Sequence, residues 1–408
     1  GCREPAQVLT LDAPGSPPRA PAADPELASW LRAVAGPLSR IACCPGPSAP
    51  AEEEGLRAAL DELLSLAERG AREMEWTRWL AAPLTLTWGE GGSASARDAV
   101  LAQVARLMDS RSPALLLKAA AVVLRVSQGP GGWHTALNAC RLLFRLSKEP
   151  QNDALFRRER LLPALVGLVQ ECAPDASGKG GTAELLVYAA GALKNTAAEP
   201  SNQRALVKGG APRVLAEALE ALAGQAPPGG GGADALAQAA TQVAGCLRHL
   251  ALSAAHAGAC VRAGAIPALS ALMGSLGSHA ELMTNVSRVL AKLSLDEEGR
   301  RALGGSEEHL RRLLATLRRH EARPALVLRL AFVLGNLTAA NSRNRAAVGL
   351  ALGGAELFEG LLARYALHGG GGGGGDREVG EHRAYATCGQ RRCGRRAGSG
   401  GGGGVLRR

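Results

Sequence analysis

The chain has 408 residues, of which 46% are hydrophobic and 21% are charged, so it can fold around a core and is not disordered throughout. Only 3% of the residues are aromatic, whereas 53 are Gly and 22 are Pro, which excludes an aromatic-rich β-sandwich or barrel. The 47 Lys and Arg exceed the 37 Asp and Glu by ten. No basic stretch is interleaved with aromatic residues, however, which disfavours nucleic acid as a partner.

The first part of the chain is rich in Pro, Ala and Gly. We expect residues 1–50 to be mostly disordered, apart from a short helix over residues 25–34. Residues 51–112 are a helical N-terminal region, because from residue 52 the apolar residues recur at helical spacing. Ser95 and Asp98 stand three residues apart, as in a capping box that begins a helix. The apolar stripe of this helix is Val100, Leu101, Val104, Leu107 and Met108.

Beyond residue 113 the sequence repeats itself. Five segments align without gaps: 139–147, 189–197, 243–251, 286–294 and 330–338. Their fifth position is always Leu, at Leu143, Leu193, Leu247, Leu290 and Leu334, and their last position is always small. These Leu residues are 50, 54, 43 and 44 positions apart, which fits the period of roughly 40 to 47 residues of three-helix solenoid repeats once insertions are allowed.

Between the aligned segments the sequence predicts a short helix, a corner and a second apolar helix. Gly210, Gly264 and Gly354 stand at three corners, where a residue with positive φ can end one helix before the next begins. The Gly- and Pro-rich stretches 174–181 and 224–232 are expected to be loops that account for the longer spacings.

The repeat pattern stops near Tyr365. We therefore expect an array of about five repeats over residues 113–366, followed by a disordered Gly/Arg-rich tail over residues 367–408. From residue 376 onward this tail has eight Arg and three acidic residues, so it holds about half of the excess positive charge. We interpret it as a truncated or misjoined C-terminus, an artefact of the gene model.

The repeat layout resembles the armadillo-repeat family, which implies an all-α, right-handed α-solenoid. The runs YAAGALKNTAAEPSNQRALVKGGA, MTNVSRVLAKLS and LVLRLAFVLGNLTAANSRNR are similar to armadillo-repeat proteins of motile cilia and flagella. That resemblance implies a non-enzymatic adaptor or scaffold without a cofactor, in the cytoplasm and the axoneme of the cilium or flagellum. Its protein partners would be axonemal cargo, such as radial-spoke or central-apparatus components, and proteins of intraflagellar transport.

Two other functions stay open. One is a general cytoplasmic armadillo scaffold in a signalling or ubiquitin pathway, unrelated to cilia. The other is nucleic-acid binding through the Arg-rich tail, which would be salt-dependent.

In armadillo proteins the third helix of each repeat lines a groove, and the position two after the aligned Leu commonly holds an Asn that binds a peptide backbone. That column here is Arg145, Asn195, His249, Lys292 and Asn336, and the column one turn earlier is Arg141, Gly191, Gly245, Arg288 and Phe332. The resemblance thus implies a partner-binding groove formed by Arg141, Arg145, Asn195, His249, Arg288, Lys292, Phe332 and Asn336. No Trp occurs after Trp133, unlike in nuclear-import receptors, and the cations of the columns favour an acidic or mixed partner.

No residues form a convincing catalytic or metal site. The string SGKGGT at 177–182 lacks the spacing of a phosphate-binding loop, and Cys388 and Cys393 have only His382 near them as a further zinc ligand. The nine Cys do not form a disulfide framework, which indicates a reduced, intracellular protein. No apolar run approaches the length of about 18 residues that a membrane span needs.

Overall fold

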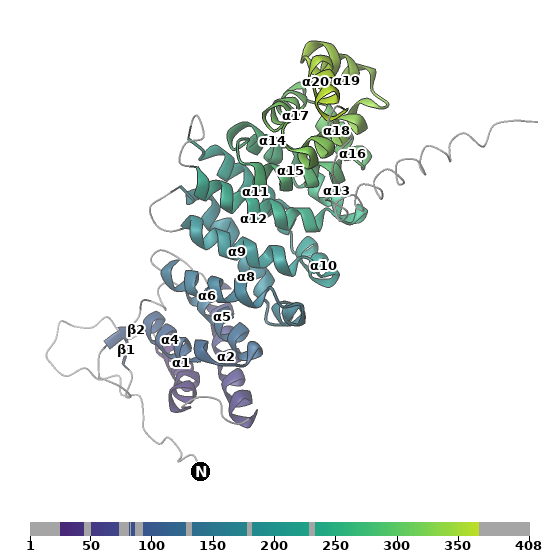
Figure 1. Cartoon of the computed structure of the whole chain (residues 1–408). Coiled ribbons are helices and arrows are strands. Elements are labelled where there is room, and N and C mark those ends of the chain that lie inside the picture. The colour runs from purple at the N-terminus through teal and green to yellow at the C-terminus, as the bar shows by residue number, and fades with distance from the viewer. Residues whose placement is uncertain are drawn as a thin grey trace, which may run out of the picture. The chain divides into compact units, whose positions relative to one another are not determined.

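The computed structural model describes residues 25–44, 50–72, 81, 83–85, 93–127, 133–177, 182–227 and 233–366. The disorder expected for the first 24 residues and for the tail lies outside the described residues. The chain divides into two units, residues 1–354 and 355–408. Within the described part of the first unit nearly every element is a helix (Figure 1).

The N-terminal helix α1 (Pro25–Cys43) is longer than the expected helix over residues 25–34. Pro37 lies inside α1, where a proline removes one backbone hydrogen bond. The helix continues because Leu38 and Ile41 are 0% and 1% exposed, and α1 packs against α2 (Pro50–Arg72). Burial of these side chains offsets the cost of the proline.

The next helix begins where the sequence predicts. Ser95 is the N-cap of α4 (Ala96–Ala105), and its Oγ accepts a hydrogen bond from the backbone N–H of Asp98 at 3.1 Å. Two three-residue strands, β1 (Pro83–Thr85) and β2 (Ser93–Ser95), pair in antiparallel orientation just before α4, which was not expected. The 3₁₀ turn η1 (Arg106–Asp109) then leads to α5 (Pro113–Val126).

Helices from successive repeats form three stacks (Figure 1). The inner stack consists of α6 (Trp133–Leu146), α9 (Thr182–Thr196), α12 (Asp234–Leu250), α15 (Ala280–Leu293) and α18 (Pro324–Thr338). The second stack consists of α2, α5, α8 (Leu161–Cys172), α11 (Ala211–Gly224), α14 (Ala265–Ser275) and α17 (Glu307–Arg319). In both stacks each helix packs against the next one in the stack. The structure is therefore the armadillo-type α-solenoid that the sequence predicts.

The third stack is made of short helices: α7 (Asp153–Arg158), α10 (Pro200–Lys208), α13 (Ala254–Arg262), α16 (Glu297–Gly304) and α19 (Ser342–Ala346). Short turns lie beside them: η2 (Pro150–Asn152), η3 (Ala173–Asp175) and η4 (Ala347–Ala351), the last a π-helical turn. The last described helix, α20 (Gly354–Ala366), lies almost entirely in the second unit.

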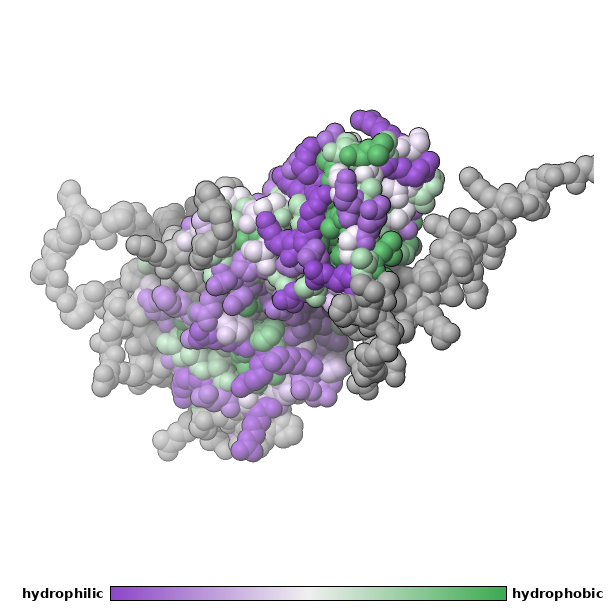
Figure 2. Space-filling view, turned by 45° about the horizontal axis from the view of Figure 1, so that its top comes forward, coloured by the Kyte–Doolittle hydropathy of each residue, from purple (hydrophilic) through white to green (hydrophobic). Residues whose placement is uncertain are grey.

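The aligned Leu residues are in the core. Leu143, Leu193, Leu247 and Leu290 are 0% exposed, and Leu334 is 1% exposed. Each packs where an inner helix meets its neighbours, so replacing one by a charged residue would bury an unpaired charge. On the face shown in Figure 2, hydrophilic residues dominate the described surface and hydrophobic residues lie in small patches among them.

Two of the three predicted glycine corners are confirmed. Gly210 and Gly264 have φ angles of +79° and +84° and precede α11 and α14. The third prediction is wrong by one residue, because Gly353, with φ of +63°, takes the left-handed conformation and Gly354 does not. A Cβ on Gly354 would instead collide with the carbonyl oxygen of Val348. Before α8 the same corner is made by Arg160, with φ of +52°.

Candidate functional site

The eight residues predicted to bind a partner all lie on the inner stack of helices. Arg141 and Arg145 are on α6, and the following helices carry Asn195 (α9), His249 (α12), Arg288 and Lys292 (α15), and Phe332 and Asn336 (α18). Because residues four apart share one face of a helix and the inner helices pack in order, these residues form columns that run from repeat to repeat. We call this set of eight residues the inner-helix surface.

Hydrogen bonds between repeats hold both asparagines of this surface. Nδ2 of Asn195 donates to Oγ of Ser147, the last residue of the preceding aligned segment, at 3.0 Å. Nδ2 of Asn336 donates to Oγ of Ser294, also at 3.0 Å. Each serine hydroxyl in turn donates to a carbonyl of its own helix. The bonds fix both amides, and among the described residues no donor reaches either Oδ1, which can therefore accept an N–H from a partner backbone.

At two other positions of this column, His249 and Lys292, the preceding aligned segment does not end in serine. His249 and Lys292 follow repeats whose aligned segments end in Ala197 and Ala251, which offer no hydroxyl. An Asn at either position would lose the acceptor that it has in the other repeats. The residue type at each position of this column thus depends on the last residue of the preceding aligned segment.

Two cationic side chains lie beside His249, in the middle of the inner-helix surface. Nη2 of Arg248 lies 3.0 Å from Nε2 of His249, and Nζ of Lys194 donates to Oε1 of Gln242 at 2.6 Å. Burial, together with the charges of Arg248 and Lys194, lowers the pKa of His249 to about 4. Burial also lowers the pKa of Lys194. His249 is therefore neutral near pH 7, and its Nε2 can accept the hydrogen bond from Arg248.

The two glycines of the earlier column receive side chains from the preceding repeat. A Cβ on Gly191 would lie 2.8 Å from the ring of Phe144, and a Cβ on Gly245 would lie 2.7 Å from Cδ of Lys194. Contacts below 3.0 Å force a neighbour to move. The flexible side chain of Lys194 can shift at low cost, whereas the ring of Phe144 is packed against Tyr188, so Gly191 is the position that requires glycine in this packing. The ring of Phe144 also packs edge-on against Tyr188, at 5.7 Å between centroids.

The two arginines of α6 differ in their surroundings. Nη2 of Arg141 forms an ion pair with Glu184 at 2.6 Å, and its guanidinium lies over the ring of Tyr188, 5.6 Å from the centroid. Arg145 is exposed, and its side chain has no ion pair or hydrogen bond among the described residues. Arg141 is thus held by α9, whereas Arg145 is available to a partner.

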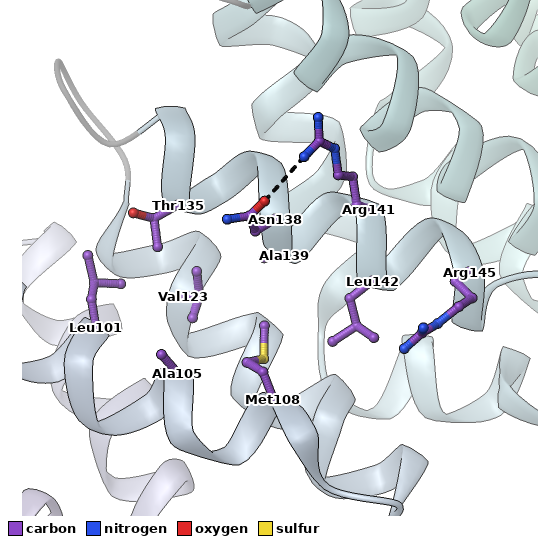
Figure 3. A pocket seen from close by; sticks show the side chains of 10 residues that line it. All are labelled: Leu101, Ala105, Met108, Val123, Thr135, Asn138, Ala139, Arg141, Leu142 and Arg145. Atoms are coloured by element: carbon purple, nitrogen blue, oxygen red, sulfur yellow. Dashed lines mark hydrogen bonds between the residues drawn. The ribbon is translucent and has the colours of Figure 1, made fainter.

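A pocket of about 430 Å³ lies beside these arginines, where α4, η1 and α5 meet α6 (Figure 3). Its apolar lining consists of Leu101, Ala105, Met108, Val123, Ala139 and Leu142. Thr135, Asn138, Arg141 and Arg145 complete the lining, and none of the lining residues is acidic. The volume is within the range of roughly 300–1,000 Å³ typical of ligand pockets.

The sequence did not reveal this pocket, although it contained a signal. In the stripe predicted for α4 and η1, Leu101 and Met108 lie about 100° around the helix from Val100 and Leu107. Val100, Val104 and Leu107 are buried, whereas Leu101 and Met108 are half-buried and face the pocket. Only the packing of α4 against α5 divides the stripe in this way.

The described residues contain no group of three or more His, Cys, Asp or Glu that could hold a metal ion. The pair Cys388 and Cys393 and residues 178–181 of the SGKGGT string lie outside the described residues. Burial raises the pKa of Cys172, Cys246 and Cys260 to about 12. In the same part of the chain no single helix has the length and hydropathy to cross a bilayer. Two pairs of consecutive helices reach that length and hydropathy only when the two helices of a pair are taken together.

No protein-family model matches the chain. A solved structure from work on a phosphorylation switch in the interaction between cadherin and beta-catenin aligns with a TM-score of 0.45 and 16% sequence identity, covering 80% of this chain and 56% of that chain.

Three curated relatives share one name, armadillo repeat-containing protein 2. The protein from Mus musculus is 26% identical over 249 residues, which is 61% of this chain and 28% of the relative. Those from Bos taurus and Homo sapiens are each 24% identical over 255 residues, which is 62% of this chain and 29% and 28% of the relatives. The chain thus spans less than a third of the length of the relatives that it matches. It is an armadillo-type α-solenoid whose sequence is similar to that of armadillo repeat-containing protein 2.

Proposed function

We propose that this chain is a non-enzymatic adaptor or scaffold that binds protein partners along its inner-helix surface and acts in the assembly of motile cilia and flagella. The observation that supports partner binding most directly is the pair of asparagines held by Ser147 and Ser294, each with a carbonyl oxygen open to a partner backbone. The ciliary role rests on the resemblance in the sequence to armadillo-repeat proteins of motile cilia.

An adaptor of this kind must hold cargo and a transport complex at once. The stacked helices offer several separate surfaces, because the inner, second and short helices each form a stack of their own. The cargo would be a radial-spoke or central-apparatus component, and the transport partner a protein of intraflagellar transport. Both the cytoplasm and the axoneme would contain the protein.

The test is to tag the protein in a flagellated cell and follow it while flagella regrow. Movement along growing flagella, together with loss of radial spokes or of the central apparatus on deletion, is the expected result. A signal that stays in the cell body and is independent of flagella would contradict the ciliary role and favour a general cytoplasmic scaffold.

Partner binding is tested separately with charge reversal on α15. Arg288→Glu combined with Lys292→Glu should weaken binding of acidic partners, because like charges then face each other. The matched control is Arg213→Glu with Lys208→Glu, at exposed positions at the end of α10 and the start of α11, which are not inner helices. Circular dichroism should show that helicity is retained in both. Equal binding by the wild-type protein and both variants would remove the inner-helix surface from the proposal.

A further inference from the structure

The pocket between α4, η1, α5 and α6 combines an apolar lining with Arg145, whose side chain has no ion pair or hydrogen bond within the described part of the chain. Leu101 and Met108 face it from the N-terminal side, and Leu142 faces it from α6 (Figure 3). Leu101, Met108 and Leu142 remain half-buried rather than buried, so the folded chain leaves apolar surface uncovered at this point. Apolar surface of this kind inside a concave site commonly binds an aliphatic side chain of a partner.

Charge decides which partner fits. Arg141 is neutralised by Glu184, but Arg145 has no acidic group near it among the described residues, and no acid lines the pocket. In Figure 3 Arg145 extends from the last turn of α6 beside Leu142. A carboxylate close to the inserted apolar side chain would therefore meet the guanidinium of Arg145, which can bind it through two N–H groups.

We propose that this pocket is the anchor for a partner segment that carries one large aliphatic side chain with an Asp or Glu a few residues away. The aliphatic side chain enters between Leu101, Met108 and Leu142, and the carboxylate pairs with Arg145. This inference rests on the proposed scaffold function and adds the site and the chemistry of one partner. It places the anchor at the N-terminal end of the inner stack, outside the aligned repeat columns except for the two arginines.

The probe is a random peptide library displayed on phage and selected on the folded full-length chain. Selected peptides are then synthesised with a fluorophore and titrated by fluorescence anisotropy. The expected result is a shared pattern of one Leu, Ile or Met with an Asp or Glu close by. Selection without that pattern would overturn the proposal.

Two matched pairs of variants locate the binding. Ala105→Gln places a longer polar side chain in the pocket and should weaken the selected peptide by about tenfold or more, because the apolar anchor loses its space. Ala102→Gln is the same change at an exposed position of α4 that does not line the pocket, and it should leave the affinity unchanged. Both positions are exposed, so neither variant should unfold the chain.

Charge is tested in the same way. Arg145→Glu should weaken the acidic peptide by about tenfold or more, and a peptide with Lys in place of its acid should regain affinity for this variant. Arg204→Glu, at an exposed position of α10, changes the net charge equally and should have little effect. Both variants keep the Arg-rich tail, so a difference between them cannot come from nonspecific attraction to the tail.

The outcomes separate this inference from the proposed function. If Ala105→Gln and Arg145→Glu leave the affinity unchanged while the Arg288 and Lys292 reversal lowers it, the anchor is wrong and the scaffold function stands. If sedimentation shows a dimer that Ala105→Gln dissociates, the occupant is a second copy and the peptide anchor is wrong. If the peptide binds as expected but the tagged protein never enters flagella, only the ciliary role falls.

Discussion

Asn195 and Ser147 join two consecutive repeats through a single hydrogen bond, from Nδ2 on α9 to Oγ at the end of α6, 3.0 Å away. Asn336 and Ser294 repeat the arrangement at the same distance three repeats later. The residues of each pair are 48 and 42 positions apart in the chain, so no local pattern reports the contact. The bond both orients the amide on the inner-helix surface and ties one repeat to the next.

Removing the hydroxyl of Ser147 tests whether this hydrogen bond stabilises the contact between the two repeats. Ser147→Ala should lower the free energy of unfolding by about 1 kcal/mol, because the half-buried amide of Asn195 loses its acceptor. Urea unfolding measures the change, and a double-mutant cycle with Asn195→Ala should give a coupling energy of about 0.5–1.5 kcal/mol.

The control for this cycle is Ser287→Ala. Ser287 is also fully buried, but its hydroxyl donates only to the Thr284 carbonyl of its own helix. The effects of Ser287→Ala and Asn195→Ala on the free energy of unfolding should therefore be additive. A coupling energy that is near zero for Ser147 as well would show that the observed hydrogen bond does not join the repeats.

Glycine at position 191 is required by packing and not by the helix. Gly191→Ala should lower the free energy of unfolding by about 1 kcal/mol, because overpacking against the rigid ring of Phe144 outweighs the gain in helix propensity. Gly167→Ala on α8 meets nothing within 4 Å, so the same change should stabilise the protein by up to about 1 kcal/mol. Thermal unfolding of the two variants measures both effects, and shifts of the same sign would contradict the packing argument.

A buried ion pair fixes α5 to its neighbours. Lys118 is 5% exposed, lies 3.2 Å from Glu159 in the turn after α7, and also pairs with Asp61 on α2. Lys118→Met should lower the free energy of unfolding by about 2 kcal/mol, because Glu159 stays buried with only Arg158 beside it.

The comparison for Lys118 is an exposed pair. Arg40 and Glu62 are about half exposed, so Arg40→Met should cost less than about 1 kcal/mol. Urea unfolding at pH 7 measures both variants. Equal costs would show that burial does not strengthen the dependence on Lys118.

His249 should make stability depend on pH. Burial and the nearby cations lower its pKa from 6.5 to about 4 in the folded chain, so between those values the unfolded chain binds more protons. Its contribution to stability is therefore fully present above about pH 6.5, falls as the pH drops through this window, and is lost below about pH 4.

The measurement is the urea midpoint at pH 7 and at pH 4.5. His249→Gln should reduce the difference between the two midpoints, whereas His134→Gln, at an exposed position of α6, should leave it as in the wild-type protein. An NMR titration of the histidine rings should show His249 still neutral at pH 5.5. Protonation of His249 near pH 6.5 would contradict the surroundings described for it.

The sequence by itself determined the features that depend on residues within one or two helical turns. Helical periodicity located the inner helices, and the aligned Leu residues predicted the core correctly. Ser95 as an N-cap, and Gly210 and Gly264 as corners, follow from local backbone chemistry, which short stretches of sequence encode directly. The resemblance to armadillo repeats then supplied the order of stacking and the columns of the inner-helix surface.

Only the tertiary structure decided the features that depend on contacts between different helices. α1 continues through Pro37 because burial against α2 offsets the missing hydrogen bond, and Leu101 and Met108 line a pocket because α4 meets α5 and α6. Likewise, Gly191 must be glycine only because Phe144 packs on it from the preceding repeat. Such contacts join residues on different helices, and the geometry of packing, not the local pattern, determines which side chains meet.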